Sequence, residues 1–188
     1  VRLIGREADV LAYEDDYRVT PFADVISTQW YAPYVGFCAE EGIISGDGEG
    51  YFKPNDNISE KAFLKLVLCA LGYAYNTDFT WNSVYQTAYS AGLVDADYVD
   101  RTIDNDNYLR GDVVDVLYCA LTRKNMETGT TMLRMLVNDG VINSELAMST
   151  GLLDDGDSDT GGGSNTGGGG NTGGMVEDES DVAVEFVN

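Results

Sequence analysis

The chain has 188 residues, of which 44% are hydrophobic, enough to pack one ordinary domain or a few small modules. Its 32 acidic residues outnumber the 11 basic ones and give a net charge of −21, which argues against binding the phosphate backbone of nucleic acid. Histidine, the usual base of serine and cysteine hydrolases, is absent, and no apolar run is long enough for membrane insertion.

Residues 1–20 are predicted to be the end of an earlier helical unit and a connector. Residues 1–5 have the pattern of a last helical turn that closes at Gly5. Because the chain does not begin with Met, we expect it to be an internal piece of a longer protein.

Residues 21–73 are predicted to form one helix-loop-helix unit. A first helix from Trp30 to Ala39 stops at Gly42, and a short β-favouring pair and a polar, glycine-rich loop over residues 45–57 follow it. The second helix carries apolar residues at helical spacing, which predicts its core face: Phe63, Leu66, Val67, Ala70 and Leu71.

Residues 74–124 repeat this unit. Residues 42–72 match residues 92–122 without a gap at a constant offset of fifty, so that Gly42, Asn55, Asp56, Asn57, Cys69, Ala70 and Leu71 meet Gly92, Asn105, Asp106, Asn107, Cys119, Ala120 and Leu121. The equivalent core face is Val113, Val116, Leu117, Ala120 and Leu121. Repeated units bury their apolar faces partly against neighbours, so the pattern predicts an all-α protein that binds ligands in grooves between units and is not itself an enzyme.

The remaining sequence changes character twice. Residues 125–153 are predicted to be a helical extension that repeats half of the pattern, and residues 154–178 an acidic, glycine-rich flexible linker. Residues 179–188 alternate like a β-strand and suggest the start of a further β-rich module.

The three cysteines, Cys38, Cys69 and Cys119, fall inside apolar helical patterns, which favours buried thiols over disulfides. With no histidine and no paired-cysteine motif, we expect no metal site and no cofactor.

Several motifs together carry a family resemblance: Phe22-Ala23-Asp24-Val25, Gly42-Ile43-Ile44-Ser45-Gly46, Gly50-Tyr51-Phe52-Lys53-Pro54, Ile58-Ser59-Glu60-Lys61-Ala62-Phe63 and Tyr108-Leu109-Arg110-Gly111-Asp112. Over roughly residues 1–124 the chain resembles S-layer homology modules, which hold exported proteins on bacterial cell walls. The resemblance implies tandem helix-loop-helix modules in a pseudo-threefold bundle, whose grooves bind secondary cell-wall polysaccharide through a terminal acidic sugar. It therefore implies an extracellular location at the cell wall or surface layer.

An anionic sugar requires a cation for its carboxylate, backbone amides at a helix start and an aromatic face. Arg110, at the first turn of the second helix in residues 74–124, is the first candidate, with Asp112 beside it. The alternative interpretation of Arg110 is a surface residue paired with Asp112 or Asp106.

In the first unit the corresponding position is Glu60, which would repel an acidic sugar and is most simply an ordinary first-turn carboxylate. Three alternatives stay open for this groove: it binds no sugar, it binds through Lys61, or it binds through Asp47, Gly46 and the backbone amides of the glycine-rich loop. The two tryptophans that open the first helices, Trp30 and Trp81, are either sugar-stacking surfaces or caps of the core.

These features predict noncovalent anchoring of a larger exported protein to the bacterial cell wall. One alternative is a surface-layer component that contacts neighbouring surface-layer proteins, and another is the tether of an extracellular enzyme whose catalytic domain lies outside this chain. A calcium-binding loop is a weaker alternative, because residues 104–107 and 155–159 lack the glycine and the bidentate acid of an EF-hand loop.

Overall fold

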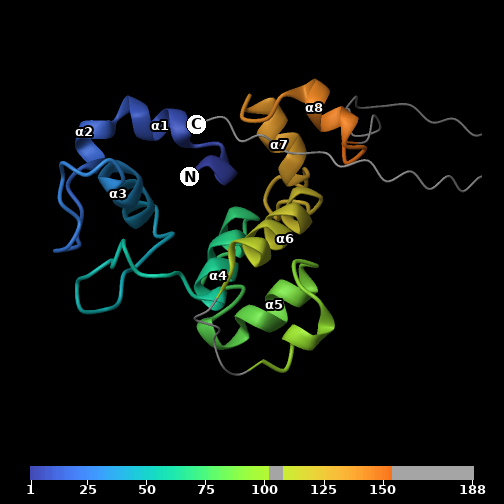
Figure 1. Ribbon diagram of the computed structural model, residues 1–188, viewed down its shortest axis with the longest axis horizontal. Helices are drawn as coiled ribbons and strands as arrows, with labels where there is room; N and C mark the ends of the chain where they lie inside the picture. The colour runs from blue at the N-terminus through green and yellow to red at the C-terminus, as the bar shows by residue number, and fades with distance from the viewer. Residues whose placement is uncertain (102–107, 154–188) are drawn as a thin grey trace, which may run out of the picture. The chain divides into compact units, whose positions relative to one another are not determined.

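The computed structural model describes residues 1–101 and 108–153, and every regular element within these two ranges is a helix (Figure 1). The expected all-α class is confirmed for this part of the chain. The linker over residues 154–178, the strand pattern over residues 179–188 and the acidic loop over residues 104–107 lie outside the described residues. No helix in the described ranges is both long and apolar enough to cross a bilayer.

The first elements are the 3-10 turn η1 (Arg2–Ile4) and the helices α1 (Glu7–Ala12), α2 (Glu14–Tyr17) and α3 (Ala32–Glu40), and α3 packs against α1 and α2. Gly36 permits the close approach of α3 to the end of α2, because a Cβ there would lie 1.9 Å from the carbonyl oxygen of Tyr17. The ring of Tyr17 meets Phe37 edge-on with centroids 5.4 Å apart.

Helix α4 (Glu60–Ala70) follows the long loop, and the Ser59 hydroxyl caps it by accepting the N–H of Ala62 at 3.3 Å. The 3-10 turn η2 (Trp81–Ser83), helix α5 (Val84–Ser90) and the 3-10 turn η3 (Ala96–Tyr98) come next. Helix α6 (Arg110–Leu121) starts fifty residues after α4, as the sequence repeat predicts, and α4 packs against both α5 and α6.

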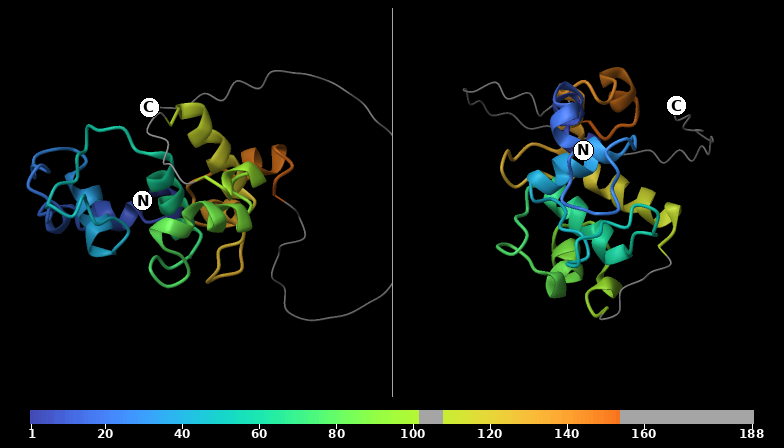
Figure 2. Two further views of the ribbon diagram at one scale, coloured as in Figure 1. Left: turned by 90° about the horizontal axis from the view of Figure 1, so that it is seen from below. Right: turned by 90° about the vertical axis from the view of Figure 1, so that its left-hand side faces the viewer.

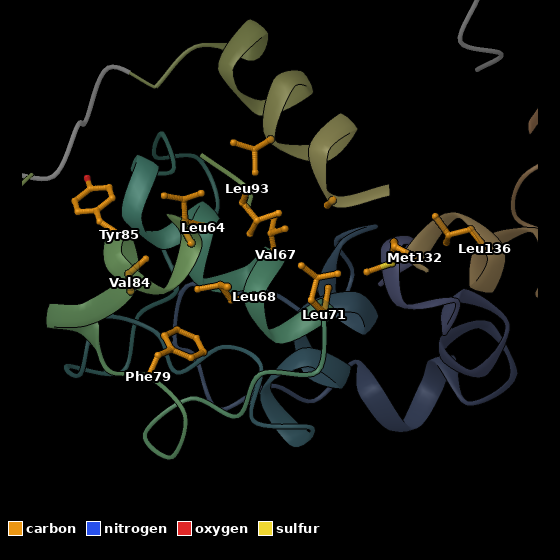
Figure 3. Close-up of a cluster of buried hydrophobic side chains, with 14 residues drawn as sticks. Leu64, Val67, Leu68, Leu71, Phe79, Val84, Tyr85, Leu93, Met132 and Leu136 are labelled. Atoms are coloured by element: carbon orange, nitrogen blue, oxygen red, sulfur yellow. The ribbon is translucent and has the colours of Figure 1, made fainter. Parts of the chain in front are cut away.

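The main hydrophobic core gathers around α4 (Figure 3). The predicted core face of α4 is only partly right: Val67, Ala70 and Leu71 are buried, but Phe63 and Leu66 are only half-buried. Instead, the helix is turned so that two leucines outside the predicted stripe are fully buried, Leu64 and Leu68. They belong to the same buried cluster as α5 residues, so contact with α5 sets the buried face.

The same chain reversal ends the first helix of each unit. Gly42 and Gly92 have φ of 68° and 71°, and the next amide bonds back to a carbonyl five residues earlier, from Ile43 to Cys38 at 2.8 Å and from Leu93 to Ala88 at 2.9 Å. This is a Schellman cap, which explains the glycine in both copies. The β-favouring pairs after these glycines therefore continue a helix cap and form no strand.

The packing partners of the second helices come from the following unit. Helix α4 packs against α5, and α6 packs against α7 (Met132–Asn138) (Figure 2). Helix α3, by contrast, packs against α1 and α2, which precede it in the chain. Met132 and Leu136 of α7 enter the main core, and α7 also contacts η1 and α8 (Ser144–Ser149). The helical extension is thus part of the core, and Gly140 repeats the glycine cap with a φ of 71°. The pseudo-threefold arrangement stays a prediction.

The three cysteines are free and half-buried. Burial raises the pKa of the Cys38 and Cys69 thiols above the ordinary value, which keeps them protonated and apolar.

Candidate functional site

A pocket of about 700 Å³ lies between the glycine-rich loop of the first unit, helix α4 and the start of the second unit. We call it the Lys65 pocket; the lining residues that matter here are Gly46, Asp47, Lys53, Lys65, Tyr75 and Trp81. It therefore brings together three residues predicted as site residues, Gly46, Asp47 and Trp81.

Asp47 shapes the loop that forms one wall of this pocket. Its Oδ1 accepts the N–H groups of Glu49 at 2.8 Å and Tyr51 at 3.1 Å, and its Oδ2 lies 3.1 Å from the Nζ of Lys53. The two backbone bonds, followed by the contact with Lys53, hold the pKa of Asp47 below its ordinary value. Because these partners occupy the carboxylate, Asp47 acts first as a loop clamp.

Gly46 is required by the loop's geometry. Its φ is +64°, and a Cβ there would lie 2.6 Å from the Phe22 ring and 2.7 Å from the carbonyl oxygen of Tyr51. Phe22 opens the Phe-Ala-Asp-Val motif, so this close contact joins two of the motifs in the sequence.

A second clamp joins the Phe22–Val25 motif to a third motif, residues 50–54. The carboxylate of Asp24 accepts the N–H of Phe52 at 2.9 Å and that of Lys53 at 2.7 Å. These backbone bonds lower the pKa of Asp24, with the Phe52 bond as the largest cause. Asp24 therefore fixes the backbone of Lys53, whose side chain lines the Lys65 pocket.

Lys65 and Tyr75 supply a cation and an aromatic face to the pocket. The Nζ of Lys65 lies 4.2 Å from the centroid of the Tyr75 ring, a cation–π distance. Tyr75 is held in turn by an edge contact with Phe79, whose centroid is 5.3 Å away. Among the residues that the structure describes, Lys65 forms no ion pair.

Lys61 and Trp81, both predicted site residues, lie together. The Nζ of Lys61 is 5.2 Å from the centroid of the Trp81 ring and 5.4 Å from that of Tyr85. Lys61 is buried, whereas Trp81 keeps 40% of its surface exposed and lines the Lys65 pocket. Trp81 is therefore the group of this pair that a ligand reaches first.

The interpretation of Glu60 as an ordinary first-turn carboxylate is wrong. Its side chain is buried, and both carboxylate oxygens lie 2.9 Å from one guanidinium nitrogen, Nη1 of Arg101. The hydroxyl of Tyr85 donates to Oε2 of Glu60 at 2.9 Å, and the guanidinium of Arg101 lies 3.6 Å from the Tyr98 ring centroid. Glu60 is therefore neutralised inside the protein and does not line the Lys65 pocket.

Trp30 lies away from the Lys65 pocket. It lines a different, mainly apolar pocket of about 730 Å³, and its side chain is 77% exposed. Its ring meets those of Tyr31 and Tyr34 edge-on. Trp30 is therefore not a cap of the core, because its position before α3 leaves it on the surface.

The candidates of the second unit are not gathered with the others. Arg110 is exposed at the first residue of α6 and lines none of these pockets, so its role stays a prediction. The carboxylate of Asp112 accepts the N–H of Leu109 at 2.9 Å and so closes the start of α6. Asp112 also lines a pocket of about 300 Å³ with Asp95, Asp115 and Arg123, which we call the Asp115 pocket.

Sequence reasoning missed Lys53, Lys65 and Tyr75. Two signals were available for Lys65. It lies one helical turn after Lys61, and the equivalent position of the second unit, Asp115, carries the opposite charge. Nothing in the local pattern identifies Tyr75, because the loop that follows α4 brings it to the pocket.

Comparison with known proteins supports the motif-based resemblance. Residues 21–63 match the family model described as S-layer homology domain. The chain is 29% identical over 107 residues to the middle cell wall protein of Brevibacillus brevis and 31% identical over 98 residues to an endoglucanase of a Bacillus species. These alignments cover 56% and 48% of this chain but only 10% of each relative. No solved structure gives a significant match.

The matched residues 21–63 contain the structural features of the first unit: the Asp24 clamp, the Gly42 helix cap, the Asp47 loop and the start of α4. Domains of this family generally anchor proteins to the cell wall and are not catalytic. The chain therefore contains an S-layer homology domain, at residues 21–63.

Proposed function

We propose that the segment that forms the Lys65 pocket, residues 43–81, anchors a larger exported protein noncovalently to the bacterial cell wall by binding an anionic wall polysaccharide in this pocket. The observation that carries the proposal is the combination of the Lys65 ammonium with the rings of Tyr75 and Trp81 around one pocket of about 700 Å³. A cation and aromatic faces are the groups that an acidic sugar needs.

The rest of the pocket also suits a saccharide. The loop over residues 45–57 presents polar backbone, and its shape is fixed by the carboxylates of Asp24 and Asp47. A pre-shaped wall lowers the entropy lost on binding, because the loop does not have to be ordered at that moment.

The test is sedimentation of the purified chain with wall sacculi, before and after acid extraction of their polysaccharide. We expect binding to intact sacculi, no binding to extracted sacculi, and competition by the free extracted polysaccharide. Polysaccharide whose carboxyl groups have been chemically reduced is the control and should compete poorly. Equal binding to intact and extracted sacculi would contradict the proposal.

The apolar pocket beside Trp30 favours a second candidate function, contact with a neighbouring surface-layer protein. An exposed tryptophan at the edge of an apolar hollow is typical of protein interfaces. Retention on sacculi that carry surface-layer protein but have lost their polysaccharide would support this function instead.

A further inference from the structure

The fifty-residue repeat relates part of the lining of the Lys65 pocket to part of the lining of the Asp115 pocket. Ile43 and Ile44 line the first pocket, and their equivalents Leu93 and Val94 line the second. Leu66 of α4 is likewise replaced by Val116 of α6. The two pockets therefore share an apolar floor and the same helix face, so differences in their remaining groups decide what each admits.

The charges on this helix face are reversed. Lys65 lines the first pocket in the middle of α4, and its equivalent in the middle of α6 is Asp115. In addition, Ala62 is replaced by Asp112, and the loop residue Ser45 by Asp95.

The aromatic faces are also lost. The residue equivalent to Tyr75 is Asn125, which is buried and donates to the carbonyl of Ala70 at 3.3 Å. Thr131 precedes α7 as Thr80 precedes the turn that Trp81 opens, so the structural counterpart of Trp81 is Met132, which is buried in the core and is not aromatic. The ring of Tyr98, which does line the second pocket, already holds the Arg101 guanidinium at 3.6 Å.

The remaining charged groups do not restore a cationic site in the Asp115 pocket. Among the described residues that line it, Arg123 is the one cation, against the carboxylates of Asp95, Asp112 and Asp115. The Lys65 pocket also contains carboxylates, Asp47 and Asp56, but Asp47 is bound to two backbone amides and to Lys53.

From this reversal we infer that glycan binding is confined to the Lys65 pocket, and that the residue at this repeat position, lysine in α4 and aspartate in α6, determines which pocket admits an anionic sugar. The inference rests on the proposed function and names the residue that confers its specificity. A like charge in the middle of the helix face repels the sugar carboxylate, whereas the lysine ammonium attracts it.

The test is isothermal titration of the full chain with acid-extracted wall polysaccharide trimmed to short oligosaccharides, at low and at moderate salt. We expect one site per chain in the unaltered protein. Lys65→Asp should weaken binding at least tenfold and remove most of its salt dependence, whereas Lys65→Arg should bind within about twofold of the original. Asp115→Asn is the matched control and should change neither affinity nor stoichiometry. Circular dichroism checks that each variant is folded, and Lys65→Gln, which keeps the length of the side chain without its charge, replaces Lys65→Asp if that variant unfolds.

Two sites in the unaltered chain, or binding that survives in both Lys65→Asp and Lys65→Gln, would overturn the inference while leaving the anchoring proposal intact. Weaker binding in Asp115→Asn would also overturn it, because it would place the sugar in the second pocket. Absence of any binding by the unaltered chain would instead refute the proposed function and this inference with it.

Discussion

One guanidinium nitrogen of Arg101 lies 2.9 Å from both carboxylate oxygens of Glu60, although the two residues are 41 positions apart in the sequence. Glu60 is at the first residue of α4 and Arg101 follows η3, so the pair ties the start of the central helix to the second unit. Tyr85 adds a hydrogen bond to the same carboxylate from α5.

We therefore expect Arg101→Ala to lower the free energy of unfolding by about 3 kcal/mol, because it leaves the Glu60 carboxylate buried without its cation. This loss of stability lies at the low end of the range for buried pairs, because the Arg101 side chain is 33% exposed. Urea unfolding measures the difference. The control is Arg2→Ala, which removes an exposed pair with Glu7 and should cost less than about 1 kcal/mol. Equal effects of the two substitutions would mean that the Glu60 pair contributes little.

Stability should fall at alkaline pH because of Tyr108. Burial is the main cause that raises the pKa of its hydroxyl above the ordinary 10.0, and its hydroxyl donates to the carbonyl of Asp112 at 3.2 Å. Because the pKa is raised in the folded state, the contribution of the Tyr108 hydroxyl to the free energy of unfolding is complete below about pH 10. It is lost as pH rises, because the tyrosine of the unfolded chain ionises first. Urea midpoints at about pH 8 and pH 11 should therefore differ less in Tyr108→Phe than in the original protein. Tyr118→Phe, which alters an exposed tyrosine of α6, should leave the difference unchanged.

Asp24 gives the opposite pH dependence. The N–H of Phe52 is the main cause that lowers the pKa of Asp24. The contribution of this carboxylate to stability is therefore present above the ordinary carboxyl pKa of 3.8 and is lost as pH falls below it. Asp24→Asn replaces one acceptor oxygen by an NH₂ group and should lower the thermal midpoint at neutral pH, with a smaller deficit in acid. Asp16→Asn, an exposed carboxylate of α2, is the comparison. A deficit that persists unchanged in acid would show that the Asp24 bonds do not depend on its charge.

The repeat and the helix ends were predictable because they depend on local patterns. Gly42 and Gly92 mark caps that require a positive φ, and Ser59 marks a helix start, so each signal lies within a few residues of the structure it sets. The helical periodicity of the apolar residues predicted that Phe63 lies on the core face of α4, whereas Leu64 is the buried residue. Contact with α5, which the periodicity does not encode, sets the side of α4 that faces inward.

The candidate site was only partly predictable, because its groups come from distant segments. Gly46, Asp47 and Trp81 followed from motifs, but the contact of Lys65 with Tyr75 depends on how the loop after α4 folds back. Glu60 was misread for the same reason. A first-turn carboxylate is normally exposed, and only a partner from beyond η3, Arg101, makes its burial favourable.

Two of the three glycines of the first loop allow a direct test of its packing. Gly46 and Gly48 both have positive φ, 64° and 86°, so an alanine at either position is strained. At Gly48 a Cβ meets nothing within 4 Å, whereas at Gly46 it would meet the Phe22 ring at 2.6 Å. Gly48→Ala should therefore cost about 1 kcal/mol, and Gly46→Ala a further 1–3 kcal/mol, about the cost of overpacking. Chemical denaturation measures both, and equal losses would mean that the Phe22 ring and the Tyr51 carbonyl both move away freely.

The two tryptophans should respond differently to the wall polysaccharide. Trp81 lines the Lys65 pocket beside Lys61, whereas the more exposed Trp30 lines the apolar pocket. In the single-tryptophan variants Trp30→Phe and Trp81→Phe, the glycan should change the fluorescence only of the protein that retains Trp81. Trp81→Ala should also weaken binding by about 1–2 kcal/mol through loss of its stacking face, and Trp30→Ala should leave affinity unchanged. A fluorescence change confined to Trp30 would instead place the sugar in the apolar pocket, where Arg2 is the one basic side chain among the described lining residues.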